Sequence, residues 1–362
     1  MRDDMLLAST HNFFSSLHVT SFLSITRLSI YQNIKILTMG CNLHTNLLAI
    51  LLLFCLSALA LVVDIPPQIL ANTISRTNNH LKAPPIPPGY SLRLLLSASE
   101  PLDPIYVYQC TVEAMYHLAE EEWEDVVHTG HSKIVKGLQV SYYDVPDRPI
   151  NMQYQHIIVA VLASVNEMDR LGDFDRAVIE MRMNKKVLGT VRIGRRSGGG
   201  MHDDDDAVMK VEGEGGGGGN STASNSTRLD SPKILVDPDD PSVTISYERF
   251  GAAIDCKLLF SAALDALATL AQNDDFDKID LFIGVNWSNR VVYQAFTEED
   301  HHQRWLLTAD LIKRVMRLVP QRLFKERACG EVIFVIFVDG RRHGAGRFRL
   351  PDEQGREEIG SR

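Results

Sequence analysis

Residues 47–63 form an apolar run that constrains this chain more than any other segment. The 17 residues carry no charge and a single hydroxyl group, that of Ser57. As a helix the run would extend about 25 Å, slightly less than the ~30 Å hydrocarbon core of a bilayer. A helix in a soluble core would show polar residues at a 3.6-residue period. The run therefore predicts an N-terminal hydrophobic helix that acts as a signal peptide or as an uncleaved signal anchor.

The residues around the run leave both alternatives open. Ala58-Leu59-Ala60 fits the small-residue pattern at which signal peptides are cleaved. A leader that includes residues 1–38 is unusually long, whereas a start at Met39 would give residues 39–63 an ordinary signal-peptide length. In both cases we expect residues 64–362 to enter the secretory pathway and to be extracellular or membrane-anchored. The membrane contact would be the apolar run itself, if it stays uncleaved.

Composition narrows the classes of function. The chain has 37 Lys+Arg and 46 Asp+Glu, so its formal net charge is 37 − 46 = −9. Nucleic-acid binding needs a basic face, and we therefore expect no nucleic-acid partner. Hydrophobic residues make up 45% and charged residues 23%, as in ordinary globular proteins. A length of 362 residues suggests about two domains.

Two segments without apolar periodicity divide the chain after the apolar run. Residues 64–90 are rich in proline and predict a stiff stalk. Residues 195–236 are rich in glycine and aspartate and predict a disordered linker. The remaining sequence forms two modules, at 91–194 and 237–350, followed by a short polar tail.

Each module shows a helical period followed by two stretches of period 2, and this succession occurs twice. We therefore expect an α+β fold, with a duplicated β-α-ββ-α-ββ module. Each module would be an antiparallel sheet with helices on one face, ferredoxin-like in outline. The seven apolar residues Val332–Val338 predict a central strand buried on both faces, and Pro320 predicts the end of the preceding helix.

Three cysteines follow the apolar run, at positions 110, 256 and 329. They allow at most one intrachain disulfide. We favour Cys110–Cys256, because each lies near the start of a helix, at equivalent positions of the two modules. Three separately buried thiols are the alternative.

Two kinds of modification site are expected in the secretory pathway. Asn220, Asn225 and Asn286 each begin an N-x-S/T triplet and are candidate glycosylation sites. The dibasic pair Arg195-Arg196 lies at the start of the expected linker and is a candidate processing site.

The sequence predicts no catalytic, cofactor-binding or metal-binding residues. His128 and His131 form an H-x-x-H triplet without a third ligand at conventional spacing. His301 and His302 follow three acidic residues, and the simplest interpretation is a helix N-terminus. His202 precedes four aspartates in the expected linker, where a solvated charge run is typical.

We therefore expect a glycoprotein, secreted or tethered by a single membrane span, that serves as a non-enzymatic interaction or structural module. Its partner would be an unidentified protein or cell-surface component. Two alternatives remain open. One is a precursor cleaved after Arg196 into two effector-like or toxin-like chains. The other is a hydrolase of unrecognised type that uses His128 or His301 with nearby acids.

Overall fold

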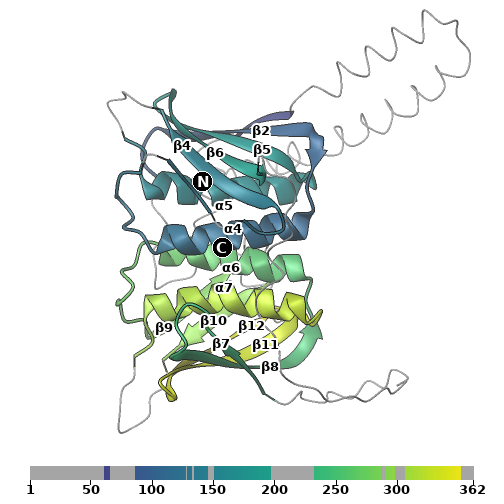
Figure 1. Ribbon diagram of the computed structural model, residues 1–362, viewed down its shortest axis with the longest axis vertical. Coiled ribbons are helices and arrows are strands. Elements are labelled where there is room, and N and C mark those ends of the chain that lie inside the picture. Colours follow the sequence, from purple (N-terminus) through teal and green to yellow (C-terminus); the bar gives the residue numbers. More distant parts are fainter. Residues whose placement is uncertain are drawn as a thin grey trace, which may run out of the picture.

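The computed structural model describes the greater part of both expected modules (Figure 1). The described residues are 61–65, 86–127, 129–132, 134–145, 151–196, 232–286, 288, 290–297 and 306–351. The expected hydrophobic helix before residue 61, Asn220, Asn225 and the polar tail after residue 351 lie outside them.

The described part of the chain consists of two halves with the same order of elements. The first half contains β1 (Leu61–Ile65), β2 (Tyr90–Pro101), α4 (Pro104–Ala119), β3 (Thr129–His131), β4 (Leu138–Asp144), α5 (Tyr154–Leu171), β5 (Asp175–Met183) and β6 (Lys186–Arg195). The second half contains β7 (Lys233–Val236), β8 (Val243–Ala253), α6 (Cys256–Leu270), β9 (Leu281–Val285), β10 (Val292–Phe296), α7 (Ala309–Lys325), β11 (Gly330–Val338) and β12 (Arg341–Arg349).

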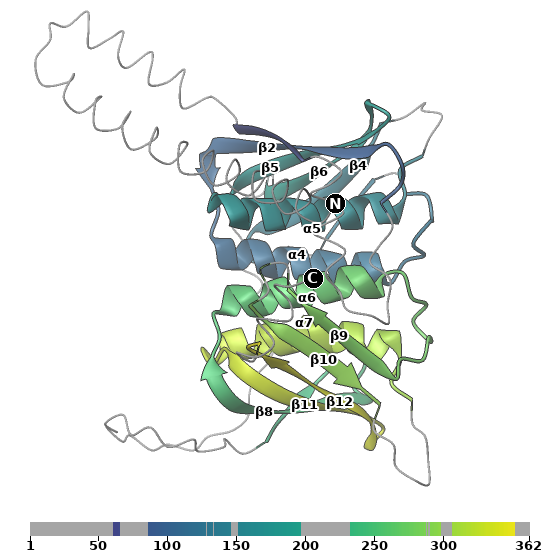
Figure 2. The ribbon, with the colours of Figure 1, turned by 180° about the vertical axis from the view of Figure 1, so that it is seen from behind.

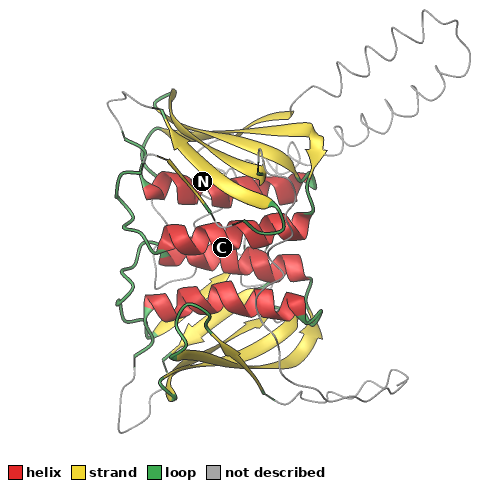
Figure 3. Cartoon of the chain, in the orientation of Figure 1, coloured by secondary structure: helices red, strands yellow, loops and turns green. Residues whose placement is uncertain are grey.

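The four helices lie between the two sheets, so the sheets turn their outer faces to opposite ends of the molecule (Figures 1 and 3). Seen from behind, α4 and α6 run side by side at the middle of the stack (Figure 2). The buried side chains of both halves belong to one continuous hydrophobic core. The two halves are therefore packed as a single unit.

Each sheet has six strands, and the two strand orders correspond one to one. They are β1-β2-β5-β6-β4-β3 and β7-β8-β11-β12-β10-β9. The expected α+β class with antiparallel sheets is confirmed. Every ladder among the described strands is antiparallel. The ferredoxin-like outline stays a prediction.

Local sequence explains how the main elements begin and turn. The first helix of each half starts after an aspartate cap: Asp103 Oδ1 accepts from the Ile105 N–H, and Asp255 Oδ1 accepts from the Lys257 N–H, both at 2.9 Å. Positive φ angles at Asp339 and Gly340 give the tight β11–β12 turn. Along β5 every second residue is buried, as expected for a sheet covered on one face.

Two edge strands were not expected. β1 takes up the last three residues of the apolar run and the first two of the expected stalk. β7 lies inside the expected linker, which therefore ends before Lys233. Both strands are short and pair with one neighbour, β2 or β8. An edge strand pairs with one neighbour only and can be as short as four or five residues. A strand this short shows too little alternation of apolar and polar residues to be recognised in the sequence.

Two further expectations about the second half are wrong. The last helix continues through Pro320 to Lys325, because the buried side chain of Leu323 beyond the proline still packs in the core. β11 is central in its sheet, but it is buried on one face only: Phe334 is fully buried, whereas Ile333 is 43% exposed.

The disulfide joins Cys256 to Cys329, not Cys256 to Cys110. Cys256 is the first residue of α6 and lies beside the start of β11, where Cys329 precedes the strand. Cys110 lies in the middle of α4, fully buried and reduced. The two helical cysteines therefore occupy different positions in their helices, which is why the expected pairing fails.

Candidate functional site

Of the histidines that the sequence analysis singled out, only His131 lies in the described part of the chain. His131 is on the exposed edge strand β3. His128, His202, His301 and His302 lie outside the described residues. Among the described residues, no group of three His, Cys, Asp or Glu side chains is arranged to hold a metal ion.

Asn286 follows β9 and is fully buried. Its Oδ1 accepts hydrogen bonds from the N–H groups of Arg290 and Val291, at 2.8 and 2.9 Å. Its Nδ2, the atom that would carry a glycan, donates to Ser288 Oγ at 2.9 Å and to Ser261 Oγ at 3.4 Å. This side chain therefore shapes the turn between β9 and β10 from the inside.

The dibasic pair lies at the end of β6. Arg195 pairs with Leu138 of β4, and the Arg196 N–H donates to Gly137 O at 3.2 Å. Both arginine side chains are exposed. A protease would have to detach the end of this strand to bind the pair in an extended conformation.

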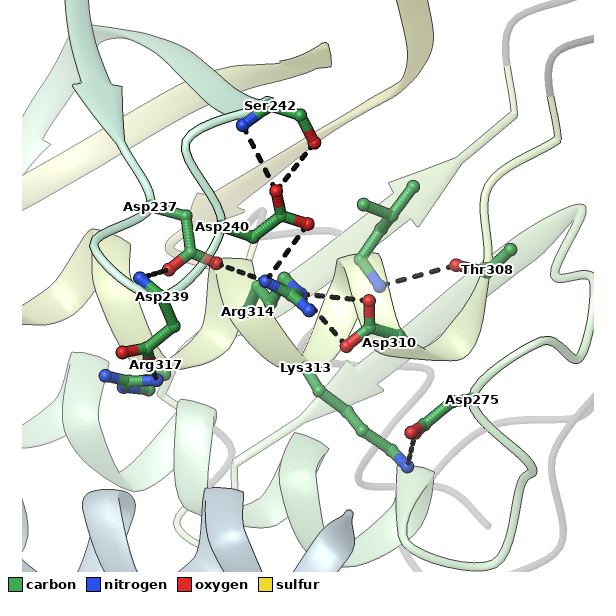
Figure 4. Close-up of polar contacts among 11 residues, drawn as sticks. Asp237, Asp239, Asp240, Ser242, Asp275, Thr308, Asp310, Lys313, Arg314 and Arg317 are labelled. Carbon is green, nitrogen blue, oxygen red and sulfur yellow. Dashed lines mark hydrogen bonds and ion pairs between the residues drawn. The ribbon is translucent and has the colours of Figure 1, made fainter. Parts of the chain in front are cut away.

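The densest polar cluster is built on α7, where Lys313, Arg314 and Arg317 meet acidic side chains (Figure 4). Lys313 is 1% exposed, and its Nζ donates to Ala119 O at 2.5 Å and to Asp275 Oδ1 at 2.8 Å. Ala119 is the last residue of α4, so an ammonium group of the second half caps a helix of the first.

Arg317 makes a second link between the halves. Its Nε lies 3.2 Å from Glu113 Oε2 of α4, and its guanidinium lies 4.5 Å from the centre of the Tyr116 ring. Gln321, one turn further along α7, donates to Glu113 Oε1. On its other side, Arg317 Nη1 lies 2.5 Å from Asp239 Oδ2.

Arg314 ties the loop after β7 to α7. It lies 2.8 Å from Asp237 Oδ2 and 2.9 Å from Asp310 Oδ2. Desolvation by itself would lower the pKa of this guanidinium, but the bonds to Asp237 and the charge of Asp310 raise the pKa overall. For Asp310, burial is the largest effect and raises the pKa of the carboxyl.

These contacts make the α7 cluster a structural element. Its three cations are occupied by carboxylates, helix-end carbonyls and an aromatic ring, which leaves none of them placed to bind a substrate anion. Cys110, the free cysteine among the described residues, has its pKa raised to about 12 by burial, so it is not a nucleophile at neutral pH.

The outer faces of the two sheets arrange their polar and apolar residues in different rows. Residues paired across neighbouring strands point to the same face of a sheet. In the first sheet one outward row reads Asp64, Arg93, Glu180, Thr190, Tyr143, Thr129. Arg182 Nη2 donates to Glu180 Oε2 at 2.5 Å, and Arg192 lies over the Tyr143 ring. The next outward row begins with Val62, Leu95 and Val178 before it reaches Arg192, so this face carries both charged and apolar side chains.

In the second sheet the corresponding face carries an uncharged row across all six strands. The row reads Ile234, Ser246, Val335, Ala345, Phe296, Leu281. Ile234 is 70% exposed, and the next row adds Ile333 at 43%. This apolar outer face, centred on β11, is the candidate functional site.

Comparisons with known proteins add no family. No family model matches the chain, and no curated protein matches it. One of the solved structures that the chain resembles is a hot dog fold protein of unknown function from Alicyclobacillus acidocaldarius. The two chains are 10% identical, the match covers 78% of this chain and 97% of that one, and the TM-score is 0.12. A putative thioesterase from Novosphingobium aromaticivorans shows 11% identity, coverage of 81% and 95%, and a TM-score of 0.13. At such TM-scores neither likeness carries an argument about fold or activity.

None of the described helices is long and apolar enough to span a membrane.

Proposed function

We propose that this chain is a secreted, non-enzymatic interaction protein whose contact surface is the outer face of the second sheet. The observation that carries the proposal is the uncharged row from Ile234 to Leu281 on that face. A sheet face that stays in water is normally polar, and an exposed apolar patch marks an interaction site.

The disulfide supports the secretory part of the proposal. Disulfides form and persist in oxidising compartments and are rare in the cytosol. Cys256 and Cys329 clip the start of α6 to the start of β11, directly under the proposed contact surface. In an oxidising compartment the Cys256–Cys329 disulfide would stay formed and would stabilise the second half of the chain.

Strand β1 supports cleavage of the leader over a retained anchor. Leu61, Val62 and Val63 pair with β2, so only residues 47–60 of the apolar run remain for a membrane helix. Those 14 residues would reach about 21 Å, well short of the ~30 Å core. Cleavage after Ala60 would start the mature chain at Leu61, the first residue of β1.

We also infer that the two halves arose by duplication. The one-to-one correspondence of strand orders and the paired aspartate caps at Asp103 and Asp255 support this.

A photo-crosslinking amino acid at position 333 tests the function. The chain would be produced in a secreting eukaryotic host, with position 178 as the matched control. Val178 lies on the outer face of β5, in the middle of the first sheet. We expect a covalent adduct of the secreted protein from position 333 and none from position 178. The absence of an adduct at 333, or equal adducts at both positions, would contradict the proposal.

A further inference from the structure

We propose that the partner of the outer face of the second sheet is a second copy of this chain, packed sheet against sheet about a twofold axis. This inference rests on the proposed contact surface and names its occupant. It is independent of the route of export.

The outer face of β11 carries apolar side chains that are exposed in the monomer. Its inward residues are fully buried, yet Ile333 stands 43% exposed, and Val335 lies beside it on the same face. An apolar central strand that is covered on one face only is an aggregation hazard in a monomer. A closed twofold dimer removes the hazard, because the same patch covers itself.

The strand order fits a twofold axis that runs along β11 between the two sheets. Such an axis places β11 against its own copy. It also places β8 against β12 of the partner subunit, and β7 against β10 of the partner subunit. Only β9 extends beyond the overlap. Two sheets packed in this way keep their strands within about 30° of each other and lie ~10 Å apart.

The apolar row is complementary to itself about this axis. Val335, at its centre, meets its own copy. The small side chain of Ser246 meets the partner's Ala345. The large side chain of Ile234 meets the partner's Phe296. The row is therefore complementary in polarity, because uncharged side chains face uncharged side chains and no charge is buried unpaired along it.

The neighbouring row is complementary in charge. It reads Glu248, Ile333, Arg347 across β8, β11 and β12. The axis brings Ile333 against its own copy and Glu248 against the partner's Arg347. Within its own chain Arg347 Nε donates to Gln294 Oε1 at 3.2 Å, which leaves the guanidinium's other N–H donors for the partner's carboxylate. Twofold symmetry forms this ion pair twice.

The overlapping part of the face has the size of a small interface. Five overlapping strands about 4.8 Å apart span ~19 Å, and a nine-residue strand such as β11 is ~30 Å long. The product, ~570 Å², lies below the ~800 Å² that each partner contributes to a standard interface and is typical of weaker complexes.

Light scattering after size-exclusion chromatography tests the inference on purified protein that begins at Leu61. We expect twice the mass of one chain at ~50 µM. Glu248→Arg and Arg347→Glu should each raise the dimer Kd at least about tenfold, because each creates two like-charge contacts. The double variant restores opposite charges and should return the Kd to within about threefold of the original. The matched control, Arg192→Glu on the outer face of the first sheet, should leave the dimer unchanged.

The crosslinker at position 333 keeps the inference testable if a charge variant does not fold. In purified protein, light should produce a covalent dimer from position 333 and none from position 178. A monomer at ~50 µM, or failure of the double variant to restore the dimer, would overturn the inference. If purified protein stays monomeric while the secreting host yields an adduct with a different protein, the second copy is excluded and the proposed contact surface stands.

Discussion

Lys313 of α7 donates a hydrogen bond to the carbonyl oxygen of Ala119, the last residue of α4, at 2.5 Å. The two residues are 194 positions apart. Their contact neutralises the negative end of a helix dipole with a buried ammonium group. The same ammonium lies 2.8 Å from Asp275 Oδ1, so one side chain joins both halves and the loop after α6.

Replacing this lysine should loosen the contact between the halves. Lys313→Met keeps the length of the side chain and removes its charge, which leaves Ala119 O and Asp275 without their cation. We expect a loss of about 2 kcal/mol in the free energy of unfolding, below the 3–5 kcal/mol typical of fully buried pairs because Asp275 is partly exposed. Lys325→Met, at the exposed end of α7, should change it by less than about 0.5 kcal/mol. Denaturant unfolding measures both.

The disulfide should stabilise the second half strongly. Its cysteines are 73 residues apart, and closing a loop of that length is worth about 4 kcal/mol in the chain-entropy model. Cys329→Ser should therefore lower the free energy of unfolding by an amount of that order and leave two free thiols among the cysteines after residue 60. Peptide mapping of the unreduced protein should recover Cys256 linked to Cys329. A peptide linking Cys256 to Cys110 would contradict the structure.

Asn286 should carry no glycan in the folded protein, although it begins a glycosylation triplet. Asn286→Ala removes the acceptor for the Arg290 and Val291 N–H groups and should cost about 2 kcal/mol. Ser288→Ala is the matched control, because it abolishes the same triplet while keeping the asparagine. Glycopeptide mass spectrometry reports occupancy, and thermal unfolding compares the variants. Equal effects of the two substitutions would indicate that a glycan, not the buried amide, matters here.

His156 should make the protein less stable in mild acid. Burial lowers the pKa of its imidazole to about 4, and its neutral Nδ1 accepts a hydrogen bond from the Gln153 N–H. Because the folded pKa lies below the unfolded value of about 6.5, the stabilising contribution is complete above about pH 6.5 and is lost as pH falls toward 4. At pH 4.5 the loss should be roughly 2.5 kcal/mol relative to pH 7. Urea unfolding at pH 7 and pH 4.5 measures it, and His156→Gln should lose less stability between those two values.

The repeated periodicity predicted much of the fold. The pairs β5–β6 and β11–β12 and their tight turns follow from alternating apolar residues and from turn residues such as Asp339-Gly340. The edge strands β1 and β7 were missed, because a short strand beside a glycine-rich or proline-rich segment has no periodicity to detect. The helix beyond Pro320 was missed because burial of Leu323 outweighs the lost backbone hydrogen bond.

The α7 cluster and the contact surface could not be predicted from local sequence. Arg317 and Glu113 are 204 positions apart, and Asp239 lies in a segment that resembles a linker. The apolar row combines one residue from each of six strands, so it exists only once the strand order is known. One signal was available in the sequence: the seven apolar residues Val332–Val338 predict a strand covered on both faces, whereas in the structure only one face is buried.

Export of the chain is the central claim, since the proposed cleavage of the leader and the persistence of the disulfide both depend on it. The most direct measurement is the N-terminal sequence and intact mass of the protein recovered from the medium of a secreting eukaryotic host. We predict a mature chain that begins at Leu61 and contains the Cys256–Cys329 bond. A chain that keeps residues 1–60, remains inside the cell and has all of its thiols reduced would contradict it.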